Sequence, residues 1–286
     1  VIAKAGMMSA ANLVQKHMLS KASTVTVASS VLEDQVGQCA LMLPNGADID
    51  ELDRIDGSFW RSQNNRPTVG FVGAFEYWVN FELVLQTAQR LPHVTFLLVG
   101  SGRRLADIKR MIAEFELDNV VLTGAKPYRE AMSYVAGMDV CLLPFTNDAV
   151  SDGSCPLKLF EYAALRKPIV STPTREVGRI GQGWIAFADD AATFAYAIEA
   201  FLADTRAASH AGEAGRAMVD TAGHGHGRAA GARRRNRVTG RRRTGGAQVD
   251  PRIARTRRLP GHRSGGRRGG TGCRGTTCGR HRSIAH

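Results

Sequence analysis

The stretch TVGFVGAFEYWVNFELVLQTAQRLPHVTFLLVG, residues 68–100, decides the fold class. It begins with a short apolar run that ends in glycine, and it closes with a second run of the same kind. Between the two runs, residues 80–91 place Phe81, Leu85 and Ala88 on one face of a helix. Both runs are continuously apolar, as strands are when helices cover both faces of a parallel sheet. The stretch therefore predicts a parallel β–α–β unit.

The same alternation continues toward the C-terminus. It predicts an α/β fold, a doubly wound, Rossmann-like parallel sheet with right-handed crossovers, over residues 67–205. The predicted strands are 68–73, 94–100, 120–123, 139–144, 168–171 and 184–187, and the predicted helices are 80–91, 103–116, 128–136, 156–166 and 191–203.

Residues 1–45 do not begin this domain. Their pattern predicts a helix, a strand at 24–28, a short helix from Ser30 and a strand at 40–43. Two strands are too few for an independent α/β domain, because the edges of so small a sheet stay unpaired. We interpret residues 1–45 as the remnant of an N-terminal domain and residues 46–66 as a linker. A chain that begins with valine is then expected to be a piece of a longer protein.

The charge of the chain is divided between two parts. The whole chain carries a net charge of +12, but residues 1–220 hold 20 Lys and Arg against 25 Asp and Glu. Residues 221–286 hold 18 Arg, one acidic residue, 15 Gly and no aromatic residue. Such a segment buries too little apolar surface to offset its chain entropy. We expect residues 206–286 to form a frayed helix followed by a disordered Arg/Gly-rich tail.

Two interpretations of this tail follow from its composition. A basic tail can bind RNA through charge alone, although the absence of aromatic side chains argues against specific nucleic-acid recognition. Arg, Gly, Ala, Thr and His without Lys is also the composition expected when a GC-rich gene is read out of frame. We favour the second interpretation.

Composition also limits where the protein works. No apolar run approaches the roughly 20 residues that a membrane-spanning helix needs, which excludes a spanning protein. The five cysteines form no CxxC pair, and the first residues lack the features of a signal peptide. These features predict a reducing, cytoplasmic location.

Two glycine-rich turns follow the first two strands of the domain, at the edge where ligands bind in open parallel sheets. Gly73 ends the first strand and allows a backbone or a ligand to approach closely, although the turn taken alone is better interpreted as a tight strand-to-loop turn. The sequence Gly100-Ser-Gly-Arg-Arg104 resembles a dinucleotide fingerprint but lacks the third glycine. We interpret the second turn as a helix start with solvated arginines.

The third feature at this edge is the sequence DGSCPLKLFEY, residues 152–162. Ser154 or Cys155 is expected to cap the helix, with Pro156 at or near its first position. The N–H groups of the first turn then form an anion site, to which Lys158 adds a full charge. Glu161 lies on the same face as Lys158, so the pair could grip a phosphate and sugar hydroxyls, or it could be an ordinary surface ion pair.

A series of motifs resembles one enzyme family in order and spacing. The chain is similar, over roughly residues 23–204, to GT-B glycosyltransferases of the group 1, glycogen-synthase-like family. The motifs are PNGADID (44–50), VG (72–73), FLLVGSG (96–102), LTG (122–124), DVCLLP (139–144), PLKLFEY (156–162) and KPIVS (167–171).

The resemblance implies that this part of the chain is the C-terminal, donor-binding half of a GT-B fold, with residues 1–45 left from the acceptor-binding half. It implies that the 154–158 turn holds the diphosphate of a nucleotide sugar, that Glu161 binds the ribose hydroxyls, and that the 124–126 loop flanks the base. The implied donor-binding residues are Gly73, Ala125, Lys126, Ser154, Leu157, Lys158 and Glu161, with no catalytic residue assigned.

The sequence departs from the family pattern at two places. The first Glu of the paired-Glu motif falls at position 153, which is glycine, although Asp152 and Ser154 adjoin it. The basic residue that usually follows the first strand is absent from residues 74–80.

The activity that the resemblance implies is retaining transfer of a sugar from a nucleotide-diphosphate donor. The expected setting is cell-envelope polysaccharide or glycolipid synthesis, with an unknown acceptor. No cofactor or metal is expected, and the N-terminal domain would provide any peripheral association with the inner face of the membrane. We expect this chain by itself to be inactive or weakly active.

Overall fold

The computed structural model describes residues 2–37, 40–63 and 65–235. The strands are β1 (Val25–Val27), β2 (Ala40–Met42), β3 (Thr68–Ala74), β4 (Thr95–Ser101), β5 (Val120–Gly124), β6 (Val140–Leu143), β7 (Ile169–Ser171) and β8 (Ile185–Phe187). The helices are α1 (Ile2–Lys21), α2 (Ser30–Val36), α3 (Ile49–Leu52), α4 (Ser58–Gln63), α5 (Phe81–Arg90), α6 (Leu105–Glu114), α7 (Tyr128–Gly137), α8 (Ala149–Asp152), α9 (Leu157–Ala164), α10 (Arg175–Ile180), α11 (Ala191–Ala203) and α12 (Thr205–Arg235).

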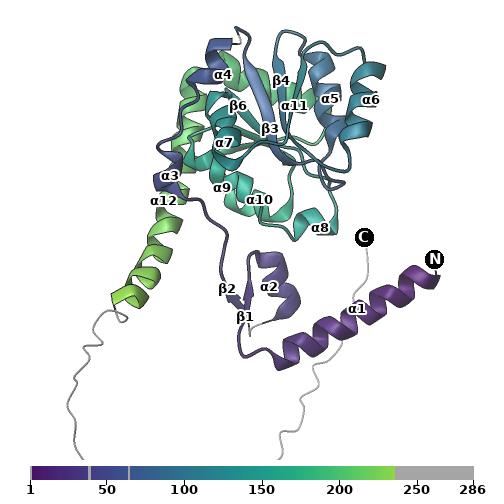
Figure 1. Cartoon of the computed structure of the whole chain (residues 1–286), viewed down its shortest axis with the longest axis vertical. Coiled ribbons are helices and arrows are strands. Elements are labelled where there is room, and N and C mark those ends of the chain that lie inside the picture. Colours follow the sequence, from purple (N-terminus) through teal and green to yellow (C-terminus); the bar gives the residue numbers. More distant parts are fainter. Residues whose placement is uncertain (1, 38–39, 64, 236–286) are drawn as a thin grey trace, which may run out of the picture. The chain divides into compact units, whose positions relative to one another are not determined.

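Six strands form one sheet in the order β5-β4-β3-β6-β7-β8. The strands β4, β3 and β6 of this sheet are labelled in Figure 1. Every neighbouring pair in this sheet is parallel. Counted from β3, the order is 3-2-1-4-5-6, which is the arrangement of a Rossmann fold. The predicted doubly wound parallel sheet is confirmed, and each of its six predicted strands is present within about two residues of its expected bounds.

Side chains that alternate along the strands fill two separate cores. On β4, Phe96 and Leu98 pack on the face that carries α5, α6 and α11, whereas Leu97 and Val99 pack on the face that carries α7, α9 and α12. On β6, Leu142 and Leu143 divide in the same way. The side chains on both faces of β4 and β6 are therefore buried in a core. This explains why these strand sequences are apolar throughout, as the apolar runs predicted.

The N-terminal segment contains the predicted helix, strand, helix and strand, with β1 and β2 paired in parallel. The region expected to be a plain linker contains two short helices, α3 and α4. Two further short helices, α8 and α10, were also not predicted from the sequence. Each has four to six residues, too few for a helical period to show, and such helices depend on tertiary contacts.

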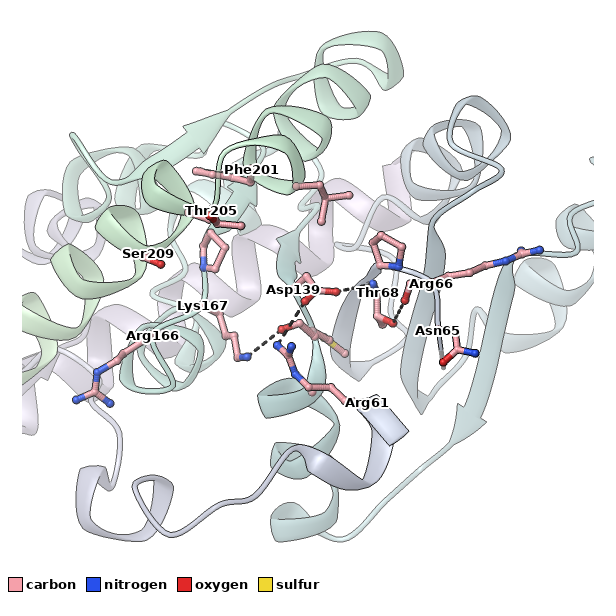
Figure 2. A pocket seen from close by; sticks show the side chains of 16 residues that line it. Arg61, Asn65, Arg66, Thr68, Asp139, Arg166, Lys167, Phe201, Thr205 and Ser209 are labelled. Carbon is pink, nitrogen blue, oxygen red and sulfur yellow. Dashed lines mark hydrogen bonds and ion pairs between the residues drawn. The ribbon is translucent and has the colours of Figure 1, made fainter. Parts of the chain in front are cut away.

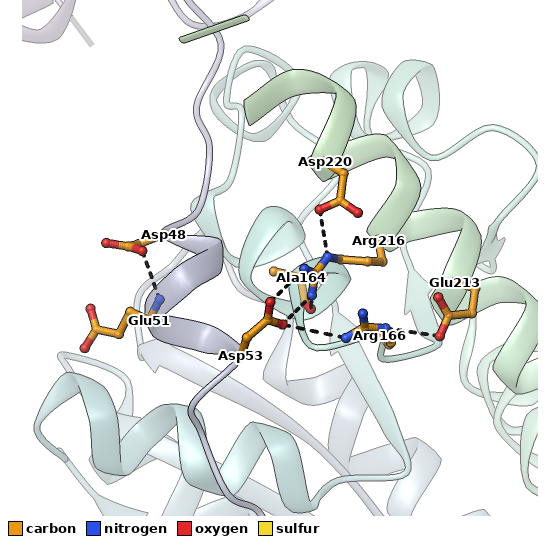
Figure 3. Close-up of polar contacts among 8 residues, drawn as sticks. All are labelled: Asp48, Glu51, Asp53, Ala164, Arg166, Glu213, Arg216 and Asp220. Atoms are coloured by element: carbon orange, nitrogen blue, oxygen red, sulfur yellow. Dashed lines mark hydrogen bonds and ion pairs between the residues drawn. The ribbon is translucent and has the colours of Figure 1, made fainter. Parts of the chain in front are cut away.

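The last helix, α12, returns along the domain and packs against α9. Its buried Arg216 contacts Asp53 of the linker segment, Asp220 of its own helix and the carbonyl of Ala164 (Figure 3). The helix continues to Arg235, into the segment expected to be disordered. The remaining tail, and with it both interpretations of the Arg/Gly-rich sequence, lies outside the described residues. Within the described residues, no helix has the length and apolar character to cross a membrane.

Candidate functional site

The site lies where the two halves of the sheet meet. β3 pairs with β6 only at Val69 and Gly70, so the two strands part toward their carboxyl ends. Beyond that point the N–H of Val72 donates to the hydroxyl of Tyr162 at 2.9 Å. Tyr162 is fully buried on α9, so this bond holds α9 against the end of β3. The strand order reverses between β3 and β6, which is where ligands bind in open α/β sheets.

The start of α9 provides backbone donors at this crevice. The helix begins at Leu157 with Pro156 at the N-cap, and no side chain caps it. The expectation that Ser154 or Cys155 caps the helix is therefore wrong. Ser154 instead donates its hydroxyl to the carbonyl of Ser151 at 2.9 Å, because the preceding turn of α8 offers a nearer acceptor. The N–H of Leu159 donates to the carbonyl of Pro156 at 3.2 Å, and the N–H groups of Leu157 and Lys158 lie before it at the positive end of the helix dipole.

Lys158 extends from this turn toward the end of β3. A Cβ atom added to Gly73 would lie 2.0 Å from Cε of Lys158, and Gly73 has a φ of +151°, which favours glycine. The Nζ atom lies 5.8 Å from the centre of the Phe71 ring. Burial lowers the pKa of Lys158, while nearby Glu161 raises it. The structure therefore brings Gly73 and Lys158 together and places a half-buried cation in the first turn of α9, whose start has no side-chain cap.

Glu161 lies one turn further along α9. Burial raises the pKa of its carboxyl group, and the charge of Lys158 and a hydrogen bond from Tyr128 oppose that shift. Tyr128 is the first residue of α7, and burial together with the charge of Glu161 raises its pKa to about 12. The sequence analysis did not assign a role to Tyr128, although an aromatic residue with a polar tip at a helix start on this edge was a usable signal.

The loop between β5 and α7 provides the other predicted residues. Ala125 is exposed. Lys126 donates to Glu130 at 2.7 Å, and its Nζ lies 5.7 Å from the centre of the Tyr134 ring. Its side chain is thus engaged along its own helix, and contact between Lys126 and a base remains a prediction that rests on the loop and not on the amine. Leu157 is half exposed at the start of α9.

The residues around Gly153 are committed to structural contacts. Asp152 accepts a hydrogen bond from the N–H of Arg175 at 2.9 Å, and Ser154 is bound to Ser151 as described above. Neither neighbour of Gly153 therefore presents a carboxylate in place of the family's first Glu. Asn45, from the PNG motif, donates to the carbonyl of Cys155 at 2.6 Å, a role that the sequence analysis did not assign.

The second glycine-rich turn has a structural role. A Cβ atom at Gly100 would lie 1.9 Å from the carbonyl oxygen of Gly73, and one at Gly102 would lie 2.4 Å from the carbonyl oxygen of Phe75. The glycines therefore allow the ends of β3 and β4 to pack together. Arg103 pairs with Glu76 at 2.7 Å. The turn leads into α6 as predicted, and Arg103 is exposed. Arg104 is half-buried and pairs with Asp107 at 2.9 Å, so it is not a fully solvated arginine.

A cavity of about 680 Å³ opens at the opposite ends of the strands (Figure 2). Its basic side chains already have partners. Lys167 donates to the carbonyls of Ala136 and Met138, where α7 ends, and Arg61 pairs with Asp139 at 3.4 Å. Cations at helix ends of this kind stabilise the fold. The cavity lies away from the carboxyl ends of the strands, so we place the functional site at α9 and not here.

Comparison with known proteins indicates the family and the fold of the domain. Residues 66–204 match the family model described as glycosyl transferases, group 1. A putative teichuronic acid biosynthesis glycosyltransferase, TuaH, from Bacillus subtilis is 31% identical over 104 residues, which are 36% of this chain and 26% of that protein. A 2-deoxystreptamine glucosyltransferase from Streptomyces kanamyceticus is 27% identical over 154 residues, 47% of this chain and 40% of that protein. The chain thus spans well under half the length of these curated relatives.

Solved structures share the fold. HepE from Anabaena, in complex with UDP and glucose, superposes with a TM-score of 0.59 at 19% identity, covering 74% of this chain and 63% of that chain. The C-terminal domain of a group 1 glycosyl transferase from Francisella tularensis superposes with a TM-score of 0.50 at 15% identity, covering 62% of this chain and 97% of that chain. The described sheet and its helices therefore have the fold of one half of a GT-B protein, and residues 66–204 match the group 1 glycosyl transferases.

Proposed function

We propose that the six-stranded domain binds the nucleoside diphosphate of a sugar donor at the start of α9. The observation that carries this proposal is the position of Lys158, a half-buried cation in the first turn of α9, whose start has no side-chain cap, with its side chain against Gly73. Backbone N–H groups at a helix start, together with a lysine, form a site suited to phosphate groups. The UDP present in the related HepE structure supports the same ligand class.

Each part of the donor has a proposed partner. The diphosphate contacts the first turn of α9, which includes Leu157, and the ammonium group of Lys158. The ribose hydroxyls donate to Glu161 in place of Tyr128, and the Ala125–Lys126 loop flanks the base. Gly73 provides the space in which the phosphates and the lysine meet.

The proposed reaction is transfer of the sugar to an acceptor with retention of anomeric configuration. Charge develops on the leaving diphosphate as the glycosidic bond breaks, and Lys158 with the helix start stabilises that charge. One relative named above is a putative teichuronic acid biosynthesis glycosyltransferase, and the other is a 2-deoxystreptamine glucosyltransferase. For this chain we propose a role in the synthesis of a cell-envelope polysaccharide or glycolipid.

Binding of nucleotides to the full chain tests the ligand class. Calorimetric titration with UDP, GDP and ADP is expected to show saturable binding of at least one of them. A chain that binds none of the three at millimolar concentration would contradict the proposal.

We also expect the chain by itself to transfer little or no sugar. In a GT-B enzyme, donor and acceptor react in the cleft between two domains. Correct positioning of two reactants can lower an activation barrier by roughly 7 to 11 kcal/mol. The chain covers 26% and 40% of its two curated relatives. An assay of the full chain with a radiolabelled donor, with and without an N-terminal domain supplied from a relative, measures this. Full turnover by the chain alone would show that the active site has been misplaced.

Donor affinity is expected to depend on pH through two shifted groups. Glu161 must be ionised to accept hydrogen bonds from the hydroxyl groups. Because its pKa is raised above the ordinary 4.5, acidification should begin to weaken donor binding while the pH is still above 4.5. Lys158 must be protonated to bind the phosphates. Because its pKa is lowered below the ordinary 10.5, raising the pH should begin to weaken donor binding before pH 10.5 is reached. Since the ligand phosphate also titrates, the measurement is the ratio of wild-type affinity to that of Glu161→Gln across pH. A ratio that stays constant on the acid side would contradict the role of Glu161.

A further inference from the structure

The start of α2 contacts the segments that surround the donor site. Ser29 is fully buried, and its hydroxyl donates to the carbonyl of Gly153 at 2.7 Å while it accepts from the N–H of Leu32 at 3.3 Å. The N–H and the hydroxyl of Ser30 both donate to Oε2 of Glu176, at 3.1 and 2.7 Å. Residues more than 120 positions apart in the sequence are therefore joined by three hydrogen bonds.

Glu176 is a fully buried carboxylate whose partners come from two segments. Besides Ser30, it pairs with Arg179 of its own helix at 2.6 Å. Burial alone would raise the pKa of Glu176, but the bonds from Arg179 and Ser30 hold it below the ordinary value. A buried carboxylate needs its donors, because losing one leaves charge without compensation. The two hydrogen bonds from Ser30 are therefore needed to keep the buried carboxylate of Glu176 compensated.

These contacts converge on the loop that leads into α9. Gly153 is held by Ser29, Asp152 by the N–H of Arg175 at the start of the helix that carries Glu176, and Cys155 by Asn45. A second link joins α2 to that helix, since Asp34 pairs with Arg175 at 2.7 Å. Only Pro156 separates Cys155 from the first residue of α9. The loop before α9 is thus held by hydrogen bonds from Ser29, Arg175 and Asn45. The position of the start of α9, and so of Lys158, depends on this loop.

We propose that Ser29, Ser30 and Glu176 are positioning residues for the diphosphate site. They act through residues 152–155, which they hold so that the first turn of α9 faces the end of β3. That the ligand is a nucleoside diphosphate rests on the proposed function above, whereas the holding of the loop does not.

Two readouts on the full chain test this inference separately. Cys155 is buried in the held loop and Cys141 is buried in the centre of the sheet. Alkylation by iodoacetamide, followed by peptide mass spectrometry, reports opening of the loop at Cys155 and opening of the whole domain at Cys141. Calorimetric titration with UDP, GDP and ADP reports the donor site.

Ser29→Ala and Ser30→Ala are expected to raise the alkylation rate of Cys155 about tenfold, as the loss of a buried hydrogen bond that closes a local segment would do. The rate at Cys141 should stay the same. Nucleotide affinity should fall about fivefold, which corresponds to about 1 kcal/mol, the usual net contribution of one hydrogen bond. Ser30→Thr keeps both donors and should restore the wild-type values. Ser133→Ala, which removes an exposed hydroxyl on α7, is the control and should change neither.

Unchanged alkylation at Cys155 in both alanine variants would overturn the inference, as would parallel increases at Cys155 and Cys141. Faster alkylation at Cys155 with unchanged nucleotide affinity would overturn the positioning role. If the wild-type chain binds no nucleotide, the proposed function fails, and the rates at Cys155 still decide whether the two serines hold the loop.

Discussion

Replacing Lys158 by alanine is expected to weaken nucleoside diphosphate binding by about 10- to 100-fold, because a hydrogen bond to a charged group contributes roughly 1.5 to 3 kcal/mol. Lys158 is half-buried in the first turn of a helix that has no side-chain cap. Its charge and the helix dipole act on the same phosphate groups, and partial burial reduces the screening of both. The measurement is calorimetric affinity of the full chain for the nucleotide that binds best.

Two matched variants separate charge from packing. Lys158→Met keeps an unbranched side chain against Phe71 and Gly73, so it should lose as much affinity as Lys158→Ala. Lys109→Ala removes the same charge from an exposed position on α6 and should leave affinity within about twofold, since exposed charges act weakly at a distance. Equal affinity in the wild type and Lys158→Ala would remove the proposed role of this residue.

Much of the fold could be predicted from local sequence, for a physical reason. Strands such as Phe96–Gly100 are buried on both faces, so the whole run is apolar and stands out from the amphipathic helices on either side. The placement of Lys158 and Glu161 on one face of α9 could also be predicted, because helical spacing puts them there. What Gly73 contacts was not visible, since it depends on how α9 meets β3 through Tyr162.

The parts that escaped prediction depend on contacts between distant segments. The N-cap of α9 was assigned to Ser154 or Cys155 from local preference, but the hydroxyl of Ser154 is taken by α8, a helix that was itself not predicted. The hydrogen bond between Tyr128 and Glu161 joins α7 to α9, and the local sequence of neither helix shows that the two residues meet. Local propensity is a weak guide wherever a tertiary contact decides the outcome.

The largest effect on stability is expected at Arg216 of α12. Its side chain is 9% exposed and binds both oxygens of Asp53, at 2.5 and 2.9 Å, the carbonyl of Ala164 at 3.1 Å and Asp220 at 2.9 Å (Figure 3). One guanidinium group thus joins the last helix, the linker segment and the end of α9. The hydrogen bond and charge of Arg216 hold the pKa of Asp53 below 3.8, so the pair is intact at neutral pH and its contribution is lost only as the pH falls through that lowered value.

Arg216→Ala is expected to lower the free energy of unfolding at pH 7 by about 2 to 4 kcal/mol, because breaking a buried ion pair costs roughly 3 to 5 kcal/mol and Asp53 remains partly hydrated here. Arg216→Lys should recover little of this, since an ammonium group cannot bind both oxygens of Asp53 and a carbonyl in the same fork geometry. Arg110→Ala is the control, because its pair with Glu114 is exposed and should change the free energy of unfolding far less than Arg216→Ala does. Urea unfolding of the full chain measures all three. A loss at Arg216 no larger than that at Arg110 would mean that α12 is held by its apolar contacts with α9 alone, and that the link from Asp53 to the last helix adds nothing to the fold.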